Sequence, residues 1–178
     1  MTALSSLPSS LSHEDIVRRI PHQGRMCLLE RVTSWDVERI SCEATSHLDA
    51  DNPLRAHGRL GAACGIEYAA QAMAVHGALV SEMQDASPGH AAAAGGPPKA
   101  GYLVSVRGVS LHVARLDDLG IPLTLRAERS SGNAASILYG FTVHAGDALL
   151  LSGRAVVMLD AAPLNPASSA AESDKEIP

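Results

Sequence analysis

The stretch that decides the fold runs from residue 61 to residue 83 and reads GAACGIEYAAQAMAVHGALVSEM. It contains no proline and is rich in alanine and methionine, which are strong helix formers. Apolar residues lie nearly all the way round the helix that this pattern predicts, and a helix of that kind is enclosed by other structure. We therefore expect one long central helix wrapped by the rest of the chain.

Six segments around this helix have the composition of β-strands. The turns at residues 131–133 (SGN) and 145–147 (AGD) suit tight hairpins. A short helix is expected to begin at Ser12, with Asp15 placed for a capping box, and to stop at Pro21. This order predicts an α+β fold, an antiparallel sheet wrapped around the central helix. The expected strands are 27–35, 39–47, 102–113, 121–130, 135–144 and 148–159.

A chain of 178 residues can bury one good core but not two, so we expect a single domain over residues 12–160. Residues 1–11 are rich in Ser, Pro and Leu and are predicted to be flexible. Residues 84–100, with AAAAGGPP at their centre, are predicted to form a mobile loop. The tail at 161–178 has the composition of a disordered segment.

Composition and charge argue against several classes of function. Aromatic residues make up only 3% of the chain and the net charge is −5, so we expect no nucleic-acid partner. No apolar run is long enough to span a bilayer, and residues 1–12 lack the features of a secretory signal. Cys27, Cys42 and Cys64 form no C-x-x-C pair, which is typical of a reduced, cytoplasmic protein. Histidines and cysteines do not fall at zinc-ligand spacing, so no metal site is expected.

The candidate chemistry lies on the central helix, where Glu67 and Gln71 are four residues apart and share a face. Their neighbours are small and apolar, and such surroundings favour the protonated form of a carboxyl. A carboxylic acid that keeps its proton near neutral pH can act as a general acid. The alternative is that Glu67 lies at the helix edge and faces water. Cys64 has the residue type of a nucleophile, but a small buried core residue is the simpler interpretation.

Two segments resemble the hot-dog-fold β-hydroxyacyl carrier-protein dehydratases of fatty-acid synthesis. That family carries a segment like PHRYPFLLVDRV, on which residues 21–32 (PHQGRMCLLERV) fall without a gap. It also carries a helix reading GLD or IIE followed by A-x-x-Q, which residues 65–71 resemble. The resemblance covers residues 16–159. It is closest to the divergent dehydratase-like proteins of aryl-polyene pigment pathways, which also read GIEYxAQ.

The resemblance implies both a fold and a reaction. The fold is the hot-dog fold, and the reaction is dehydration of a β-hydroxyacyl thioester carried by an acyl carrier protein. It implies no cofactor besides the carrier's phosphopantetheine arm, and a place in fatty-acid or polyene-type biosynthesis. Glu67 would be the catalytic acid, supported by Gln71, and a backbone amide at Gly61 or Ala62 would polarise the thioester carbonyl. A dimer is implied, with the acid from one chain and a histidine from the other.

One family motif is missing from this chain. The family's catalytic histidine lies in a His-Phe-x-Gly loop about fourteen residues before the acid, where this sequence has Pro53. His57, ten residues before Glu67, is the candidate base, and His22 is the alternative. The missing motif leads to the hypothesis that this chain donates the acid to a heterodimer; a homodimer is the other arrangement. A thioesterase of the same fold and a non-catalytic acyl-binding subunit remain open as alternative functions.

Overall fold

The computed structural model describes residues 9–85, 101–133 and 136–159. The predicted loop at 86–100, the tail and residues 1–8 lie outside them. Two helices are described, α1 (His13–Val17) and α2 (Gly65–Asp85), with the short 3-10 turns η1 (Gly24–Met26), η2 (Ser46–Leu48) and η3 (Ala62–Cys64). The strands are β1 (Arg31–Trp35), β2 (Arg39–Ala44), β3 (Gly101–Leu111), β4 (Leu123–Gly132), β5 (Ser136–Ala145) and β6 (Ala148–Leu159).

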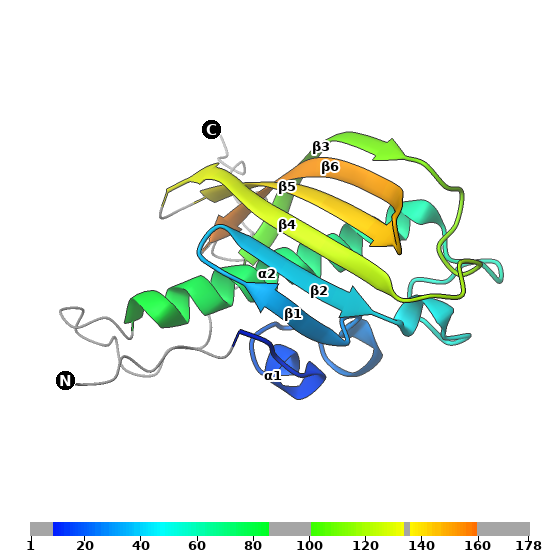
Figure 1. The fold of residues 1–178 in the computed structure, drawn as a ribbon, viewed down its shortest axis with the longest axis horizontal. Helices are drawn as coiled ribbons and strands as arrows, with labels where there is room; N and C mark the ends of the chain where they lie inside the picture. The colour runs from blue at the N-terminus through cyan, green and yellow to red at the C-terminus, as the bar shows by residue number, and fades with distance from the viewer. Residues whose placement is uncertain (1–8, 86–100, 134–135, 160–178) are drawn as a thin grey trace, which may run out of the picture.

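The six strands form one antiparallel sheet in the order β1-β2-β4-β5-β6-β3, and α2 lies across one face of it (Figure 1). This confirms the predicted α+β arrangement. Strand β1 begins at Arg31 rather than at residue 27, because residues 24–26 turn as η1 and the backbone of Leu28 binds a side chain of α2 instead of a strand. None of the described helices is long and apolar enough to cross a membrane.

The first described residues are more ordered than their composition predicts. The capping box at Ser12 and Asp15 is present, as expected. Leu11, however, belongs to the segment that we predicted to be flexible, and it is 4% exposed. Its N–H and C=O both bond to Val32 of β1, at 3.1 and 2.9 Å. An edge strand offers unpaired backbone groups, and Leu11 satisfies one pair of them while burying an apolar side chain.

The core between α2 and the sheet is mainly aliphatic, as the scarcity of aromatic residues predicts, although Tyr68, Tyr139 and Phe141 are buried in it. Alternate residues of β5 are buried from Ile137 to Ala145, facing the helix. Gly65 allows a close approach where α2 begins, because a Cβ there would overlap the side chain of Leu151 in β6, which would have to move. This close approach fixes the first turn of α2, which carries Glu67, against the sheet. The buried residues that α2 contributes include Tyr68, Ala69, Ala72, Met73, Val75 and Leu79.

The start of α2 is also held by the loop that follows β3. Leu116 N–H donates to Leu60 O at 2.9 Å. Nearby, the carboxylate of Asp117 is 1% exposed and binds the guanidinium groups of Arg115 and Arg55 at 2.7 and 2.6 Å. Hydrogen bonds from Arg115 hold the pKa of Asp117 far below its usual range, so this buried ion cluster stays charged. It joins the loop before α2 to the loop after β3.

Candidate active site

His22, Glu67 and Gln71 meet where α2 faces the loop between α1 and β1. Glu67 Oε1 lies 3.1 Å from His22 Nε2 and 3.0 Å from Gln71 Nε2. The side chains of His22 and Glu67 are 29% and 32% exposed, whereas Gln71 is fully buried. Glu67 is therefore half-buried beside two polar groups. It is neither enclosed by apolar residues nor at a helix edge in open water.

The orientation of Gln71 is set by the loop backbone. Its Oε1 accepts a hydrogen bond from Leu28 N–H at 2.8 Å, which turns Nε2 toward Met26 O at 2.8 Å and toward Glu67. A side-chain amide nitrogen can only donate. Glu67 Oε1 must therefore accept from Gln71, and a proton carried by Glu67 belongs on Oε2.

Both ring nitrogens of His22 face the protein, and Nε2 contacts Glu67. When Glu67 is ionised, its oxygens can only accept hydrogen bonds. His22 Nε2 therefore carries the proton of the hydrogen bond between His22 and Glu67. The other ring nitrogen, Nδ1, is buried and has no hydrogen-bond partner within the described residues. Neither nitrogen of His22 is thus open to a substrate in this arrangement.

His57 lies apart from this cluster, at the tip of a tight turn. Ala56 and Arg59 exchange backbone hydrogen bonds of 3.0 and 3.1 Å. Between them, His57 and Gly58 have φ values of 52° and 72°, as the central residues of a type I′ turn require. The His57 side chain is exposed. Within one chain, the structure brings Glu67 together with His22 and not with His57.

The two predicted backbone donors at the helix start differ. Ala62 N–H donates to Ala114 O at 3.2 Å, so it is not free to bind a thioester carbonyl in this structure. Gly61 N–H has no backbone acceptor within the described residues but interacts with the thiol of Cys64, whose pKa this contact lowers. A Cβ built on Gly61 would meet nothing within 4 Å. Gly61 therefore remains the candidate donor, because a thiol sulfur is only a weak acceptor and a carbonyl oxygen could replace it.

The sequence reasoning missed a buried network beside Glu67. The hydroxyl of Tyr68 lies 2.9 Å from both Ser46 Oγ and Asn52 Nδ2, and Ser46 Oγ donates to Leu28 O at 2.8 Å. Burial raises the pKa of Tyr68, which keeps its proton. The tyrosine directly after the acid was the only available signal, because its partners come from separate loops and have ordinary residue types.

Cys64 has no features of a nucleophile. Its Sγ lies 3.7 Å from Leu54 O, and burial raises the pKa of the thiol, whereas an activated cysteine needs a lowered pKa. The described residues contain no group of three or more His, Cys, Asp or Glu side chains that could hold a metal ion.

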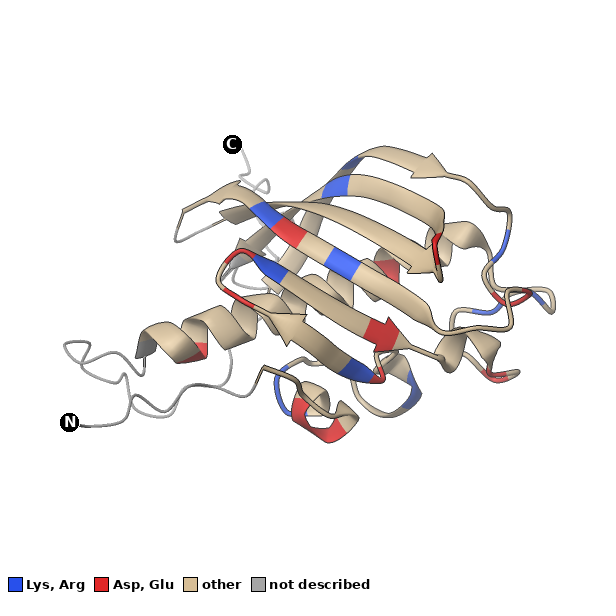
Figure 2. Cartoon of the chain, in the orientation of Figure 1, with Lys and Arg blue, Asp and Glu red and all other residues tan. Residues whose placement is uncertain are grey.

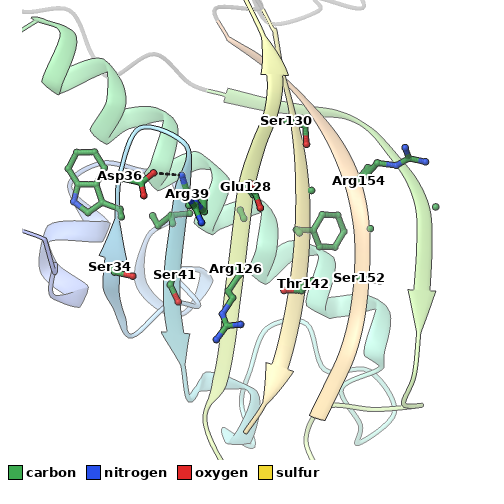
Figure 3. A pocket seen from close by; sticks show the side chains of 17 residues that line it. Ser34, Asp36, Arg39, Ser41, Arg126, Glu128, Ser130, Thr142, Ser152 and Arg154 are labelled. Carbon is green, nitrogen blue, oxygen red and sulfur yellow. Dashed lines mark hydrogen bonds between the residues drawn. The ribbon is translucent and has the colours of Figure 1, made fainter. Parts of the chain in front are cut away.

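A groove of about 880 Å³ lies on the face of the sheet that is turned away from α2 (Figure 3). It shares no residue with the cluster around Glu67, and its lining is about equally polar and apolar. Serine and threonine hydroxyls form much of its floor, and arginines line it on several strands. Its labelled residues include Ser34, Ser41, Arg126, Thr142, Ser152 and Arg154.

Comparisons with known proteins agree with this architecture. The dehydratase heterocomplex ApeI:P from Xenorhabdus doucetiae has a TM-score of 0.66 at 21% identity, over 81% of this chain and 90% of that one. A thioesterase family protein from Silicibacter pomeroyi has a TM-score of 0.56 at 16% identity, over 83% of this chain and 94% of that one. The comparison with curated proteins finds no match. The structural likenesses confirm the hot-dog fold, which dehydratases and thioesterases share.

The family comparison is more specific than the fold. The sequence model of the ApeP dehydratases matches residues 14–165, a range that includes His22, Glu67 and Gln71 together with the whole described sheet. The chain therefore belongs to the ApeP-like dehydratase family.

Proposed function

We propose that this protein takes part in the dehydration of a β-hydroxyacyl thioester borne on an acyl carrier protein, with Glu67 as the proton donor. The observation that carries the proposal is the arrangement at the carboxyl. His22 and Gln71 hold Oε1, and Oε2 has no partner within the described residues. Oε2 is therefore the atom that can hold a proton and deliver it to a substrate.

The reaction removes one proton and one hydroxyl from neighbouring carbons. A histidine takes the proton from the carbon next to the thioester carbonyl. The electron pair of the broken carbon–hydrogen bond forms the new carbon–carbon double bond. The bond to the β-hydroxyl breaks as Glu67 Oε2 gives its proton to the departing oxygen, which leaves as water. Negative charge that develops on the carbonyl oxygen is stabilised by a backbone N–H, for which Gly61 is the candidate. These steps need no metal or redox cofactor.

The base in this proposal comes from a second subunit. His22 has its Nε2 on Glu67 and its Nδ1 buried, and His57 lies at the tip of a separate turn. A hot-dog partner with an intact His-Phe motif would supply the missing histidine, which favours a heterodimer over a homodimer. The likeness to a dehydratase heterocomplex supports this arrangement.

The edge strand β3 offers a surface for such a partner. It pairs only with β6, so its outer backbone groups are unpaired within the described sheet. Three successive apolar side chains on it are exposed, Tyr102 by 42%, Leu103 by 39% and Val104 by 52%. An exposed apolar edge strand is a template for a strand from another chain.

The carrier protein is proposed to contact the outer face of the sheet. Arg107 of β3 and Arg154 of β6 are direct cross-strand neighbours, and neither has an acidic partner within the described residues. Basic residues also occur along β3, β4 and β6 (Figure 2). Like charges placed opposite each other destabilise a sheet unless another group compensates them, and acidic carriers offer such groups. We place this reaction in the cytoplasm, in fatty-acid or polyene-type synthesis.

Reconstitution tests the proposal. The purified protein is mixed with a β-hydroxyacyl carrier substrate, alone and with a hot-dog subunit that carries the His-Phe motif. The proposal predicts an unsaturated thioester from the mixture and little from either chain alone. Full activity from this chain alone, abolished by His57→Ala, would contradict a base from a different subunit. Release of a free thiol would instead indicate the alternative thioesterase function.

A further inference from the structure

We infer that Asn52 is a positioning residue that joins Glu67 and the turn bearing His57 into one hydrogen-bonded unit. This inference rests on the proposed function, because it concerns how the acid is held for the reaction. It follows from the directions of the hydrogen bonds, which the chemistry of the donors and acceptors fixes one by one.

The directions on the Asn52 side are determined by backbone groups. Asn52 Oδ1 accepts from Leu54 N–H at 2.9 Å, so its Nδ2 donates to Ser46 O at 2.8 Å and to the Tyr68 hydroxyl at 2.9 Å. Ser46 Oγ uses its proton on Leu28 O, since a carbonyl can only accept. The proton between Tyr68 and Ser46 therefore comes from Tyr68.

Leu28 connects this half of the network to Glu67. The C=O of Leu28 accepts from Ser46, and its N–H donates to Gln71. Both backbone polar groups of Leu28 are therefore bound to side chains of the network. Gln71 then donates to Glu67 Oε1. A shift of Asn52 is transmitted through Ser46 to Leu28, and from Leu28 through Gln71 to the carboxyl.

Asn52 also holds the base of the His57 turn. Its backbone C=O accepts from Arg55 N–H at 3.0 Å. The guanidinium of Arg55 in turn donates to Gly58 O at 3.3 Å and to the buried carboxylate of Asp117 at 2.6 Å. The turn and the acid thus share one buried residue, which is only 6% exposed.

The network has little freedom to rearrange. Tyr68 and Gln71 have no exposed surface, and every polar side-chain atom in the chain from Asn52 to Gln71 is paired within it. Loss of one member leaves buried partners unsatisfied, and the structure must move to pair them. A small displacement of a catalytic group is enough to slow a reaction by up to about a hundredfold.

Three variants test this, each assayed in the complex with a hot-dog partner. Asn52→Asp keeps the acceptor for Leu54 but has no N–H for Tyr68 and Ser46. Tyr68→Phe removes the hydroxyl, and Ser46→Ala removes the donor to Leu28. We expect kcat to fall by about tenfold or more in each, with KM changed by less than about twofold.

The matched control is Tyr139→Phe. The Tyr139 hydroxyl is also buried and also bound to a side chain of α2, at 2.8 Å from His76 Nδ1, but on the other half of the helix. We expect this variant to lose comparable stability in urea unfolding while keeping its kcat. Ser46→Thr, which retains the hydroxyl, is expected to restore most of the activity lost in Ser46→Ala.

The outcomes separate the two claims. If the wild-type complex does not dehydrate the substrate, the proposed function fails. If it does, and the Asn52, Tyr68 and Ser46 variants fold and keep wild-type kcat, the positioning role fails. Loss of kcat in Tyr139→Phe equal to that in Tyr68→Phe would also overturn it, because general destabilisation would then account for both.

Discussion

Gln71 Nε2 lies 3.0 Å from Glu67 Oε1, one helical turn away, and this contact decides which oxygen of the acid can carry a proton. The same nitrogen donates to Met26 O, and Gln71 Oε1 accepts from Leu28 N–H. The glutamine therefore cannot turn over without losing two buried backbone partners. It holds Oε1 of Glu67 against the protein, while Oε2 has no partner within the described residues.

The first prediction concerns Gln71. Gln71→Ala should reduce kcat by about tenfold or more, because Oε1 loses a fixed donor. It should also lower the free energy of unfolding by about 1–3 kcal/mol, since Leu28 N–H and Met26 O lose their partner in the interior. Urea unfolding and dehydration kinetics measure the two effects. Gln84→Ala, at an exposed glutamine of α2, is the control and should change neither; an unchanged kcat in Gln71→Ala would refute the assignment.

The second prediction separates a holding role of His22 from a role as base. His22→Gln keeps an N–H donor near Glu67 and should retain activity within about tenfold of the wild type, because neither nitrogen of His22 faces a substrate. Replacing the catalytic histidine of the partner subunit should cost about a hundredfold or more. A loss of that larger size in His22→Gln would identify His22 as the base.

The third prediction is a pH dependence of stability from His76. This histidine is fully buried, donates from Nε2 to Asp36 O at 2.8 Å, and accepts from the Tyr139 hydroxyl. Burial lowers the pKa of His76 below its ordinary value of 6.5, and burial likewise lowers that of His47. The unfolded chain therefore binds more protons than the folded chain as the pH falls below 6.5.

The free energy of unfolding should accordingly be highest above pH 6.5. It should decrease as the pH falls through the lowered pKa values of His76 and His47. Urea unfolding at about pH 7.5 and about pH 5.5 measures the difference, and His76→Gln should reduce it. The same loss of stability in wild type and His76→Gln would show that other groups are responsible.

The fourth prediction concerns the carrier. Arg107→Glu and Arg154→Glu should raise KM for a carrier-borne substrate by about tenfold, because they replace attraction to an acidic protein by repulsion. A short thioester without the carrier should react as before. Arg18→Glu, on an exposed arginine that is already paired with Glu14 and Asp15, serves as the control. Equal KM values in Arg154→Glu and wild type would place the carrier elsewhere.

The sequence was sufficient for those parts of the site that depend on local spacing. Glu67 and Gln71 are four residues apart on an uninterrupted helix, so their contact follows from helix geometry. The sheet also followed from local patterns, since alternation and turn residues mark its strands. The start of β1 was wrong by four residues, because Leu28 bonds to Gln71, a partner 43 residues away.

The choice between the histidines needed three-dimensional information. His22 and His57 are both loop residues, and nothing in their spacing states that residue 22 reaches Glu67 while residue 57 turns outward. The network of Asn52, Ser46 and Tyr68 was missed for the same reason, because its members are separated by loops. The hydrogen bond from Ala62 N–H to Ala114 O could not be predicted either, because it depends on how the loop after β3 packs against the start of α2.

The most direct measurement is the rate of dehydration by the complex when Glu67 is replaced by Gln, with Glu30→Gln at an exposed acid as the control. Glutamine keeps the shape and an oxygen that can accept from Gln71, but it has no proton to give. The account predicts that Glu67→Gln lowers kcat by about a hundredfold or more, while Glu30→Gln leaves it unchanged. Wild-type turnover in Glu67→Gln would contradict it and would make this chain a non-catalytic subunit.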